Sequence, residues 1–384
     1  MTDNRLKYPF LDLKAANAPY EPQLREAAAR VIGSGRYIGG EENEAFERQL
    51  ASLCGAPYAV GVSNGLDALR LIFTALIRLG RLREGDAVIV PANTYIASLL
   101  AVTDAGLIPV PVDPDPSTMN LSAEGIKKAM TDRVKAVLPV HLYGRACWDP
   151  QIAQAARDNS LIVVEDAAQS IGARARCRGL HTSDMTGALG HAGAFSFYPT
   201  KNIGALGDAG AVVTHDGELA AAIRALSNYG SDRRYHNIFA GYNCRLDPLQ
   251  AAMLRVRMAD IDAISRRRRE RAEAYSRYIT NPLITLPPMP ESDFECVWHQ
   301  YVIRVGEGMR DGLRQYMLEQ GVGTDIHYPV PPHLQPCYTG LPHGPLPVTE
   351  KLAAEIVSLP IGDPLETGQI IEISRIINNI SPKQ

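Results

Sequence analysis

The chain has 384 residues, with 39 basic and 42 acidic side chains and a formal net charge of −3 at pH 7. Hydrophobic residues make up 46% and charged residues 21%, which is typical of a soluble globular enzyme. The near-neutral charge argues against a protein that binds nucleic acid or an anionic membrane surface. No run of 18 apolar residues predicts a membrane span, and the N-terminus lacks the apolar core of a secretory signal.

The six cysteines stand singly along the chain, without a CxxC pair. Such spacing is typical of reduced thiols and predicts neither a disulfide framework nor a metal site. We therefore expect a cytoplasmic α/β enzyme with no bound metal.

Short runs rich in valine and isoleucine recur through the first 215 residues, and helical segments lie between them. Continuous apolar runs predict strands that are buried on both faces of a sheet. The alternation predicts a mixed, mostly parallel central sheet with helices on both faces. We expect strands at 58–62, 87–92, 108–112, 134–140, 161–167, 192–198 and 210–214, and helices at 66–80, 95–105, 121–131, 150–159 and 217–227.

The pattern changes near residue 245. Residues 246–279 contain no glycine, and their single proline, Pro248, stands where a helix would begin. The segment predicts one long linking helix, or two helices end to end. We interpret its four arginines at 266–269 as a solvated helix face interleaved with acidic residues, rather than as a nucleic-acid site.

A smaller α+β region follows, with a strand expected at 297–305 and a helix at 308–320. The chain is therefore predicted to contain a large domain, 1–245, and a linking helix with a smaller C-terminal domain, 246–384.

The turn after the first predicted strand carries Ser63, Asn64 and Gly65 into a helix. Free N–H groups and the positive end of the helix dipole make such a turn an anion site suited to phosphate. Serine and asparagine are also ordinary helix caps, so the turn alone leaves both interpretations open.

Two acids, Glu165 and Asp166, come at the end of the strand expected at 161–167. Ligands of open α/β sheets bind at the carboxyl ends of the strands. A buried carboxylate there requires a cation or hydrogen-bond donors. It could cap the following turn or keep a heterocyclic nitrogen protonated, and the pattern fits both.

Lys201 gives the strongest signal. It follows the aromatic run FSFYP and precedes a glycine-rich loop. Partial burial lowers the pKa of a lysine and frees its amine to form a Schiff base. A lysine with an aspartate on a neighbouring strand is the pair that pyridoxal phosphate (PLP) requires. Tyr95, at the end of another predicted strand, fits either a place on a cofactor ring or a place in the core.

Seven motifs, spread over nearly the whole chain, resemble those of the DegT/DnrJ-type nucleotide-sugar aminotransferases. The resemblance implies the aspartate-aminotransferase-like fold (PLP fold type I), PLP as cofactor and a homodimer with shared active sites. The motifs are RYIGGEENEAFERQLASLCGAPYAVGVSNG (36–65), VPANTYIAS (90–98), HLYGRACWD (141–149), VEDAAQSIGA (164–173), FSFYPTKNIGALGDAGAVVT (195–214), GYNCRLDPLQAAML (241–254) and IHYPVPPH (326–333).

Carried over by position, the resemblance makes Lys201 the lysine that forms the Schiff base. It pairs Asp166 with the pyridinium nitrogen and sets Gln169 against the ring hydroxyl. Leu66 departs from the threonine frequent in the family, so it can offer only its backbone N–H. The resemblance implies further contacts with the cofactor ring from Tyr95, with its phosphate from Gly65, Leu66, Ser196 and the partner subunit's Asn243, and with the sugar nucleotide from His327, Tyr328 and His333.

A closer similarity, over SNGLDALRLIF (63–73) and residues 84–115, is to enzymes that make dTDP-3-amino-3,6-dideoxyhexoses. It implies transfer of the amino group of L-glutamate to C3 of a dTDP-3-keto-6-deoxyhexose, with pyridoxamine phosphate formed on the way. Three alternatives stay open: a C4 aminotransferase acting on a dTDP- or UDP-4-keto-6-deoxy sugar, a PLP-dependent sugar dehydratase, and a non-catalytic regulator. The presence of Lys201 argues against a dehydratase, whose relatives in the family lack the lysine. Lys201, Asp166 and Gln169 together argue against a regulator.

Overall fold

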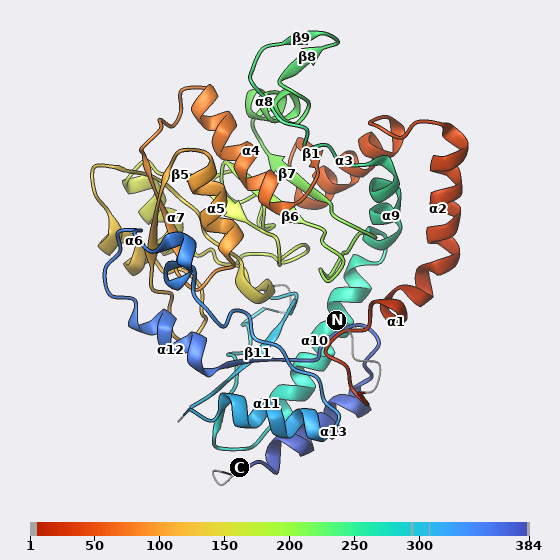
Figure 1. Ribbon diagram of the computed structural model, residues 1–384, viewed down its shortest axis with the longest axis vertical. Coiled ribbons are helices and arrows are strands. Elements are labelled where there is room, and N and C mark those ends of the chain that lie inside the picture. The colour runs from red at the N-terminus through yellow and green to blue at the C-terminus, as the bar shows by residue number, and fades with distance from the viewer. Residues whose placement is uncertain (1–5, 293–294, 307, 382–384) are drawn as a thin grey trace.

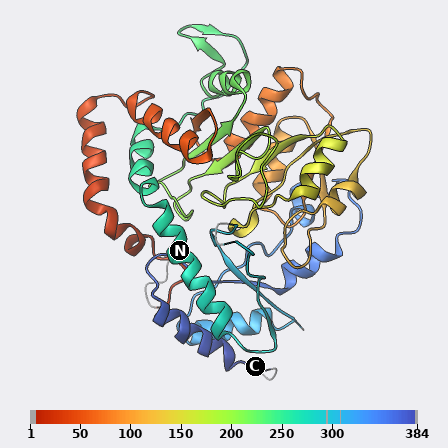
Figure 2. The ribbon, with the colours of Figure 1, turned by 180° about the vertical axis from the view of Figure 1, so that it is seen from behind.

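The structure, a computed structural model, describes residues 6–292, 295–306 and 308–381. A large sheet wrapped by helices occupies one end of the molecule, and a smaller sheet with its own helices occupies the other (Figures 1 and 2). Helix α10 (Ile261–Tyr278) runs from the first part to the second. This layered architecture confirms the predicted α/β class.

The large sheet has seven strands in the order β1-β7-β6-β5-β4-β2-β3. Only β7 is antiparallel to its neighbours, so the other six strands point the same way. Their carboxyl ends therefore meet at one edge, where ligands of such sheets bind. The strands are β1 (Tyr58–Val62), β2 (Ala87–Pro91), β3 (Ile108–Val112), β4 (Val134–Val137), β5 (Ile162–Asp166), β6 (Ala192–Ser196) and β7 (Gly210–Thr214).

Both faces of the large sheet are covered, as the continuous apolar runs predicted. Alternate residues of β2 belong to different cores, because side chains along a strand point to opposite faces. Val88 and Val90 pack with α4, α5 and α8, whereas Ala87 and Ile89 pack with α6 and α7. These helices are α4 (Gly65–Arg78), α5 (Ile96–Asp104), α6 (Ala123–Ala129), α7 (Pro150–Asp158) and α8 (Gly217–Ser227).

The second face is completed by two further helices, α3 (Glu41–Cys54) and α9 (Pro248–Met258). Helix α2 (Glu21–Ser34) packs against the outside of α9. The segment 246–279 thus forms two helices end to end, α9 and α10, and the first begins at Pro248 as predicted. The short α1 (Leu13–Asn17) and η1 (Ala18–Tyr20) precede α2.

The smaller core contains side chains from α10, from a three-stranded antiparallel sheet and from two helices, α11 and α13. Tyr8, near the N-terminus, belongs to this core, while α9 packs with the large sheet. The division at residue 245 therefore stays a proposal. The elements of this part are β10 (Ile284–Thr285), β11 (Tyr301–Val305), β12 (Ile356–Leu359), α11 (Arg310–Glu319), α12 (Pro347–Glu355), α13 (Thr367–Asn378), η3 (Pro332–Leu334) and η4 (Pro336–Tyr338).

The strand expected at 297–305 is shorter than predicted, because the residues of its first half form hydrogen bonds with another part of the chain instead of with the small sheet. Val297 N–H donates to Gly144 O and Gln300 N–H donates to Tyr143 O. Both acceptors lie in the short helix η2 (Leu142–Gly144), beside the edge of the large sheet. Residues 297–300 thereby fasten the smaller part of the molecule to the large one.

The interpretation of the arginine run as a solvated face was wrong for part of it. Arg266 is exposed, but Arg268 is buried with 6% of its surface accessible. Arg267 and Arg271 both form ion pairs with Asp363. The helix turns these long side chains toward the smaller domain. A run of arginines that is typical of an exposed helix face therefore includes one that is buried, Arg268.

A two-stranded hairpin of β8 (Ser231–Arg233) and β9 (His236–Asn237) projects from the end of α8, at the top of Figure 1. No pattern in the sequence predicts this hairpin. Its apolar side chains are unusually accessible for a folded chain, and Tyr235 is 87% exposed.

Among the described residues, no helix is both long and apolar enough to cross a membrane. All six cysteines are free thiols, as predicted.

Candidate active site

The carboxyl edge of the large sheet brings four of the predicted elements together. The turns after β1 and β2 carry Gly65 and Tyr95 to this edge, and β5 and β6 end there at Asp166 and Ser196. Lys201 lies in the loop that follows β6. The predicted lysine and aspartate therefore come from adjacent parallel strands, since β5 and β6 pair directly.

Asp166 ends β5 and is 7% exposed. Ser98 Oγ donates a 2.7 Å hydrogen bond to its Oδ2, and the Ala168 N–H donates a 3.1 Å bond to its Oδ1. Two carboxylate oxygens offer about four acceptor positions, so these bonds orient the group and leave room for another donor. Asp166 can thus accept a hydrogen bond from a protonated ring nitrogen.

Glu165, the preceding residue, is fully buried and already satisfied. Its carboxylate accepts hydrogen bonds of 2.7–2.8 Å from the N–H groups of Gly187, Leu189 and Gly190. His141 adds a fourth at 2.8 Å through Nε2, because its Nδ1 accepts from the Cys147 N–H. Glu165 therefore anchors the loops around the site and has no capacity left for a ligand.

Lys201 carries the reactive group that the site requires. Burial lowers the pKa of its amine to about 8, although the nearby Asp166 carboxylate acts in the opposite direction. A lysine with a pKa close to neutrality loses its proton readily and can then act as a nucleophile or base. The structure thereby supports the role that the sequence predicts for Lys201.

The turn between β1 and α4 forms a tight cradle against the end of β6. A Cβ atom on Gly65 would lie 2.7 Å from the Ser196 Cβ, so no side chain fits at residue 65. Asn64 caps α4 by accepting from the Asp67 N–H, which leaves the first N–H groups of the helix, those of Gly65 and Leu66, without an acceptor inside the helix. These N–H groups, the helix dipole and the Ser196 hydroxyl fit the phosphate of PLP.

The ring positions predicted for the cofactor are lined by aromatic and amide groups. Tyr95 is 53% exposed, and its ring centroid lies 5.0 Å from that of Tyr328. Gln169 accepts a 2.6 Å hydrogen bond from the Tyr143 N–H and donates a 3.1 Å bond to the Tyr328 hydroxyl. Gln169 and Tyr328 thus meet at the site, although they come from different ends of the chain.

Asn243 was predicted to act in the partner subunit's site. It lies in an extended segment beside β1, where the Ser63 N–H donates to Cys244 O, and its side chain is exposed. Exposure leaves the side chain accessible to a second subunit, and the shared contact stays a prediction.

Of the three residues predicted for the sugar nucleotide, His327 and Tyr328 lie together, with ring centroids 5.5 Å apart, and His333 lies apart from them. Burial, together with the charge of Lys201, lowers the pKa of His327, whose Nδ1 lies 2.8 Å from Ser358 Oγ. Tyr328 reaches Gln169 as described. His333 instead lies in a separate cluster, 3.5 Å from Glu350. A sugar contact through His333 therefore has the weakest structural support of the three.

Two residues of the site were missed in the sequence. Ser98, which holds Asp166, lies three residues after Tyr95 on the first turn of α5, so helical spacing could have revealed it. His299 is buried, and its Nδ1 lies 3.1 Å from Asn202 Oδ1. Burial and the charge of Lys201 lower the pKa of His299 far below its usual value, so it is neutral. No local pattern points to His299, because about 100 residues separate it from Lys201.

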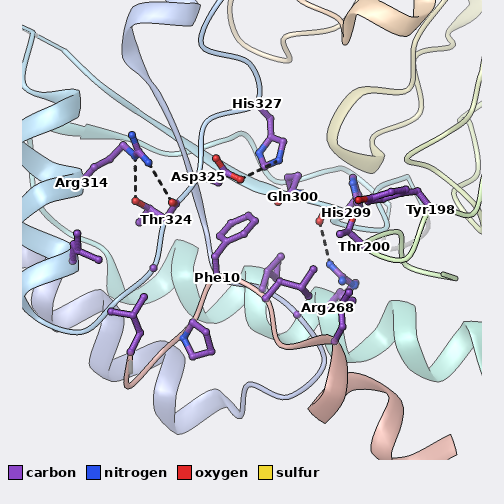
Figure 3. Close-up of a pocket in the computed structure, with 18 of the residues that line it drawn as sticks. Phe10, Tyr198, Thr200, Arg268, His299, Gln300, Arg314, Thr324, Asp325 and His327 are labelled. Carbon is purple, nitrogen blue, oxygen red and sulfur yellow. Dashed lines mark hydrogen bonds and ion pairs between the residues drawn. The ribbon is translucent and has the colours of Figure 1, made fainter. Parts of the chain in front are cut away.

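A cavity of about 860 Å³ opens between this edge and the smaller domain (Figure 3). Tyr198 and Thr200, which precede Lys201, line one side, and His299 and His327 belong to the same lining. Lys201 itself does not line the cavity, but the segment that carries it does through Thr200, and the volume is large enough for a substrate.

Comparison with known proteins identifies relatives that are similar to this chain over most of their length. A profile described as the DegT/DnrJ/EryC1/StrS aminotransferase family matches residues 20–378. The dTDP-3-amino-3,6-dideoxy-alpha-D-galactopyranose transaminase of Aneurinibacillus thermoaerophilus is 45% identical over 370 residues, covering 96% of this chain and 98% of the relative. The erythromycin biosynthesis sensory transduction protein EryC1 of Saccharopolyspora erythraea is 46% identical over 358 residues, covering 92% and 94%.

Solved structures show the same fold. The crystal structure of S. venezuelae DesV in complex with a ketimine intermediate matches with a TM-score of 0.89 at 44% identity. The match covers 97% of this chain and 98% of the DesV chain.

Proposed function

Because this chain belongs to the DegT/DnrJ/EryC1/StrS aminotransferase family, we propose that it transfers the amino group of L-glutamate to C3 of a dTDP-3-keto-6-deoxyhexose. The products are 2-oxoglutarate and a dTDP-3-amino-3,6-dideoxyhexose. One observation carries the proposal: Lys201, with its lowered pKa, lies beside Asp166 in a chain whose relative in A. thermoaerophilus is named as a dTDP-3-amino sugar transaminase.

Family membership confirms three predictions from the sequence, namely the family, the aspartate-aminotransferase-like fold and PLP as cofactor. The chain is a PLP-dependent aminotransferase. When bound, PLP acts as the electron sink for the negative charge that develops as a proton leaves the substrate carbon. The residues that would hold it are Lys201, Asp166 at the ring nitrogen, Gln169 and Tyr95 at the ring, and Gly65, Leu66 and Ser196 at the phosphate.

Lys201 and Asp166 divide the chemistry of the reaction between them. The freed Lys201 amine takes the proton from the substrate carbon and delivers it on the other side of the transfer, so it acts as base and then as acid. A pKa of about 8 suits both roles near neutral pH. Asp166, oriented by Ser98, keeps the ring nitrogen protonated by accepting its hydrogen bond.

A homodimer with shared active sites is part of the proposal. Asn243 is exposed beside the phosphate cradle, and the projecting hairpin between α8 and α9 bears the exposed Tyr229, Tyr235 and Ile238. Apolar side chains on a projecting hairpin favour burial against a second subunit. We also place the enzyme in the cytoplasm, where its six free thiols would stay reduced.

Regiochemistry is the first point to test. The pyridoxamine form of the purified protein is mixed with dTDP-3-keto- and dTDP-4-keto-6-deoxyglucose, and the return of the pyridoxal absorbance is followed. We expect return with the 3-keto sugar. Return with the 4-keto sugar alone would replace the proposal by the C4 alternative, and a protein that neither binds PLP nor reacts would be a regulator, as the name of EryC1 suggests for that relative.

The shared site is tested by mixing two inactive proteins. Lys201→Ala and Asn243→Ala damage opposite subunits of a shared site, so a mixed dimer keeps one intact site. After exchange of subunits at equal concentrations, about one quarter of the wild-type activity should return, because half of the dimers are mixed. If Asn243 acted within its own subunit, each site of a mixed dimer would lack either Lys201 or Asn243. Mixing would then restore no activity at any ratio of the two subunits.

A further inference from the structure

The cavity beside Lys201 contains a buried cation that no acid of the described residues neutralises. Arg268, on α10, lines this cavity and is 6% exposed. Its Nη1 donates to the carbonyl oxygens of Trp298 and His299 at 2.9 and 3.1 Å. Nε has no hydrogen-bond partner, and Nη2 donates to none of the described residues. One edge of the guanidinium therefore has bonding capacity left.

The neighbouring arginines of α10 are bound differently. Arg267 Nη2 lies 3.1 Å from Asp363 Oδ2, and Arg271 Nη1 lies 3.2 Å from Asp363 Oδ1. The two share one carboxylate. Arg268 receives only the distant attraction of Asp363, while burial and the positive charge of its neighbours lower its pKa to about 10. It therefore stays protonated at neutral pH.

A buried and unpaired guanidinium is costly, and the cost falls when an anion binds to it. Figure 3 shows Arg268 rising from α10 toward His299 and Thr200. Thr200 directly precedes Lys201, and the charge of Lys201 acts on His299 and His327, which line the same cavity. The charges of Arg268 and Lys201 both act on His299, so an anion at Arg268 would lie on the side of His299 that faces the cavity, next to the segment that carries Lys201.

An α-amino acid has this arrangement of charges, because its amino and carboxylate groups share one carbon. We propose that Arg268 binds the α-carboxylate of the amino donor and so positions the donor's amino group at Lys201. This inference rests on the proposed function and names the residue through which the donor is recognised. Guanidinium and carboxylate are well matched in geometry, since two parallel N–H groups can meet two oxygens.

The second arginine of the cavity is a matched control. Arg314, on α11, lies across the cavity in Figure 3 and donates to Thr324 Oγ1 and O at 3.4 Å. Its positive charge also acts on Asp311, another lining residue, so it has an acidic neighbour. Arg314 thus shares the cavity with Arg268 but not its lack of a nearby acid.

The test measures binding of α-methyl-L-glutamate, an amino acid with no Cα proton to lose, to the PLP-loaded protein by calorimetry. Loss of a hydrogen-bonded charge at the binding site should weaken the affinity of Arg268→Gln by about 30-fold or more. Arg314→Gln and the exposed Arg266→Gln should stay within about threefold of wild type. Equal affinity of Arg268→Gln and wild type, or an equal loss in Arg314→Gln, would overturn the proposal.

The half of the reaction that consumes the keto sugar distinguishes a structural role of Arg268 from a role in binding the donor. The pyridoxamine form of Arg268→Gln should still react with the keto sugar at close to the wild-type rate, because that step needs no amino donor. Equal losses in both halves would show that Arg268 only supports the fold and would overturn the proposal. If Arg268→Gln does not fold, Arg268→Lys takes its place. This variant should bind the amino acid about tenfold more weakly, because lysine lacks the planar guanidinium with its parallel N–H groups. Unchanged affinity would contradict the proposal.

The behaviour of the wild-type protein distinguishes failure of the proposed function from failure of the role of Arg268. A wild-type protein that accepts no amino acid as donor would overturn the proposed function together with the role of Arg268. A wild-type protein that reacts with L-glutamate, beside an Arg268→Gln variant that reacts equally well, would overturn only the role of Arg268.

Discussion

The carboxyl edge of the large sheet and the wall that the smaller domain sets against it build the site in different ways. At the edge, Asp166 and Glu165 are held by donors from neighbouring strands and turns, mostly backbone N–H groups. At the wall, side chains that are distant in the sequence meet: His299 contacts Asn202, 97 residues away, and Tyr328 contacts Gln169, 159 residues away. Arg268 of α10 lines the cavity beside them. The edge therefore supplies fixed charge and the reactive amine, whereas the wall supplies burial and neutral or cationic contacts.

The largest expected effect belongs to the edge. Lys201→Ala removes the amine that we propose accepts the substrate proton, so turnover should fall by about 10⁴-fold. The measurement is steady-state turnover with L-glutamate and the keto sugar. Lys201→Arg, which keeps a cation but cannot release its proton near neutral pH, should be equally inactive. Activity of either variant above one hundredth of wild type would remove Lys201 from its assigned role.

Asp166→Asn is the next test of the edge. The amide keeps the size of the side chain but removes the negative charge that favours a protonated ring nitrogen. We expect turnover to fall by about 10²- to 10³-fold while PLP still binds. Absorbance gives the cofactor content and a coupled assay gives the turnover. Near-normal turnover at full cofactor content would contradict the role of Asp166.

Glu165→Gln tests whether its neighbour serves structure instead of chemistry. The amide would point N–H groups at donors that now bond to the carboxylate, which is fully buried. We expect the free energy of unfolding to fall by about 3 kcal/mol, measured in urea. Glu165 would then be structural, whereas its neighbour Asp166 takes part in the chemistry. A Glu165→Gln variant of normal stability that had lost turnover would contradict the structural role of Glu165.

The contrast between edge and wall also explains what the sequence predicts. Gly65, Asp166 and Lys201 could be predicted because each follows a recognisable buried strand, and parallel strands bring their ends together. Ser98 was within reach, since it lies one helical turn from Tyr95. The strands and helices of the large sheet could also be predicted, because their apolar runs are visible in the local sequence without reference to distant residues.

The wall could not be predicted in this way. His299 lies in a segment that reads as a strand, yet residues 297–300 bond to the turn that contains Tyr143 and Gly144. Arg268 stands in a run of four arginines whose pattern is that of an exposed helix face. Only the tertiary packing of α10 against the smaller domain decides which of the four is buried. The residues that we propose for substrate recognition, Arg268 among them, are drawn from this part, so specificity is harder to predict than chemistry.

The pH dependence joins the two regions, because the wall buries the amine that the edge provides. In the pyridoxamine form the Lys201 amine is free, and its pKa of about 8 is below the ordinary lysine value of 10.5. The rate of reaction with the keto sugar should therefore rise with pH up to about 8 and level off above it, with a loss of about tenfold per unit at lower pH. Stopped-flow measurements from pH 6 to about 10 would show this, and a midpoint near the ordinary lysine value would mean that burial does not act on the free amine.

The smallest effect is expected at the wall, for Tyr328→Phe. The hydroxyl of Tyr328 accepts a 3.1 Å hydrogen bond from Gln169 Nε2, while Gln169 Oε1 keeps its 2.6 Å bond from the Tyr143 N–H. Since one of two bonds remains, Gln169 should stay in place, and turnover should fall by about threefold to tenfold. The ring of Tyr328 still packs against Tyr95, so PLP content should not change. Gln169→Ala is the matched comparison, because it removes both bonds. If Tyr328→Phe costs as much as Gln169→Ala or Asp166→Asn, the wall takes part in the proton transfer itself and the division between edge and wall fails.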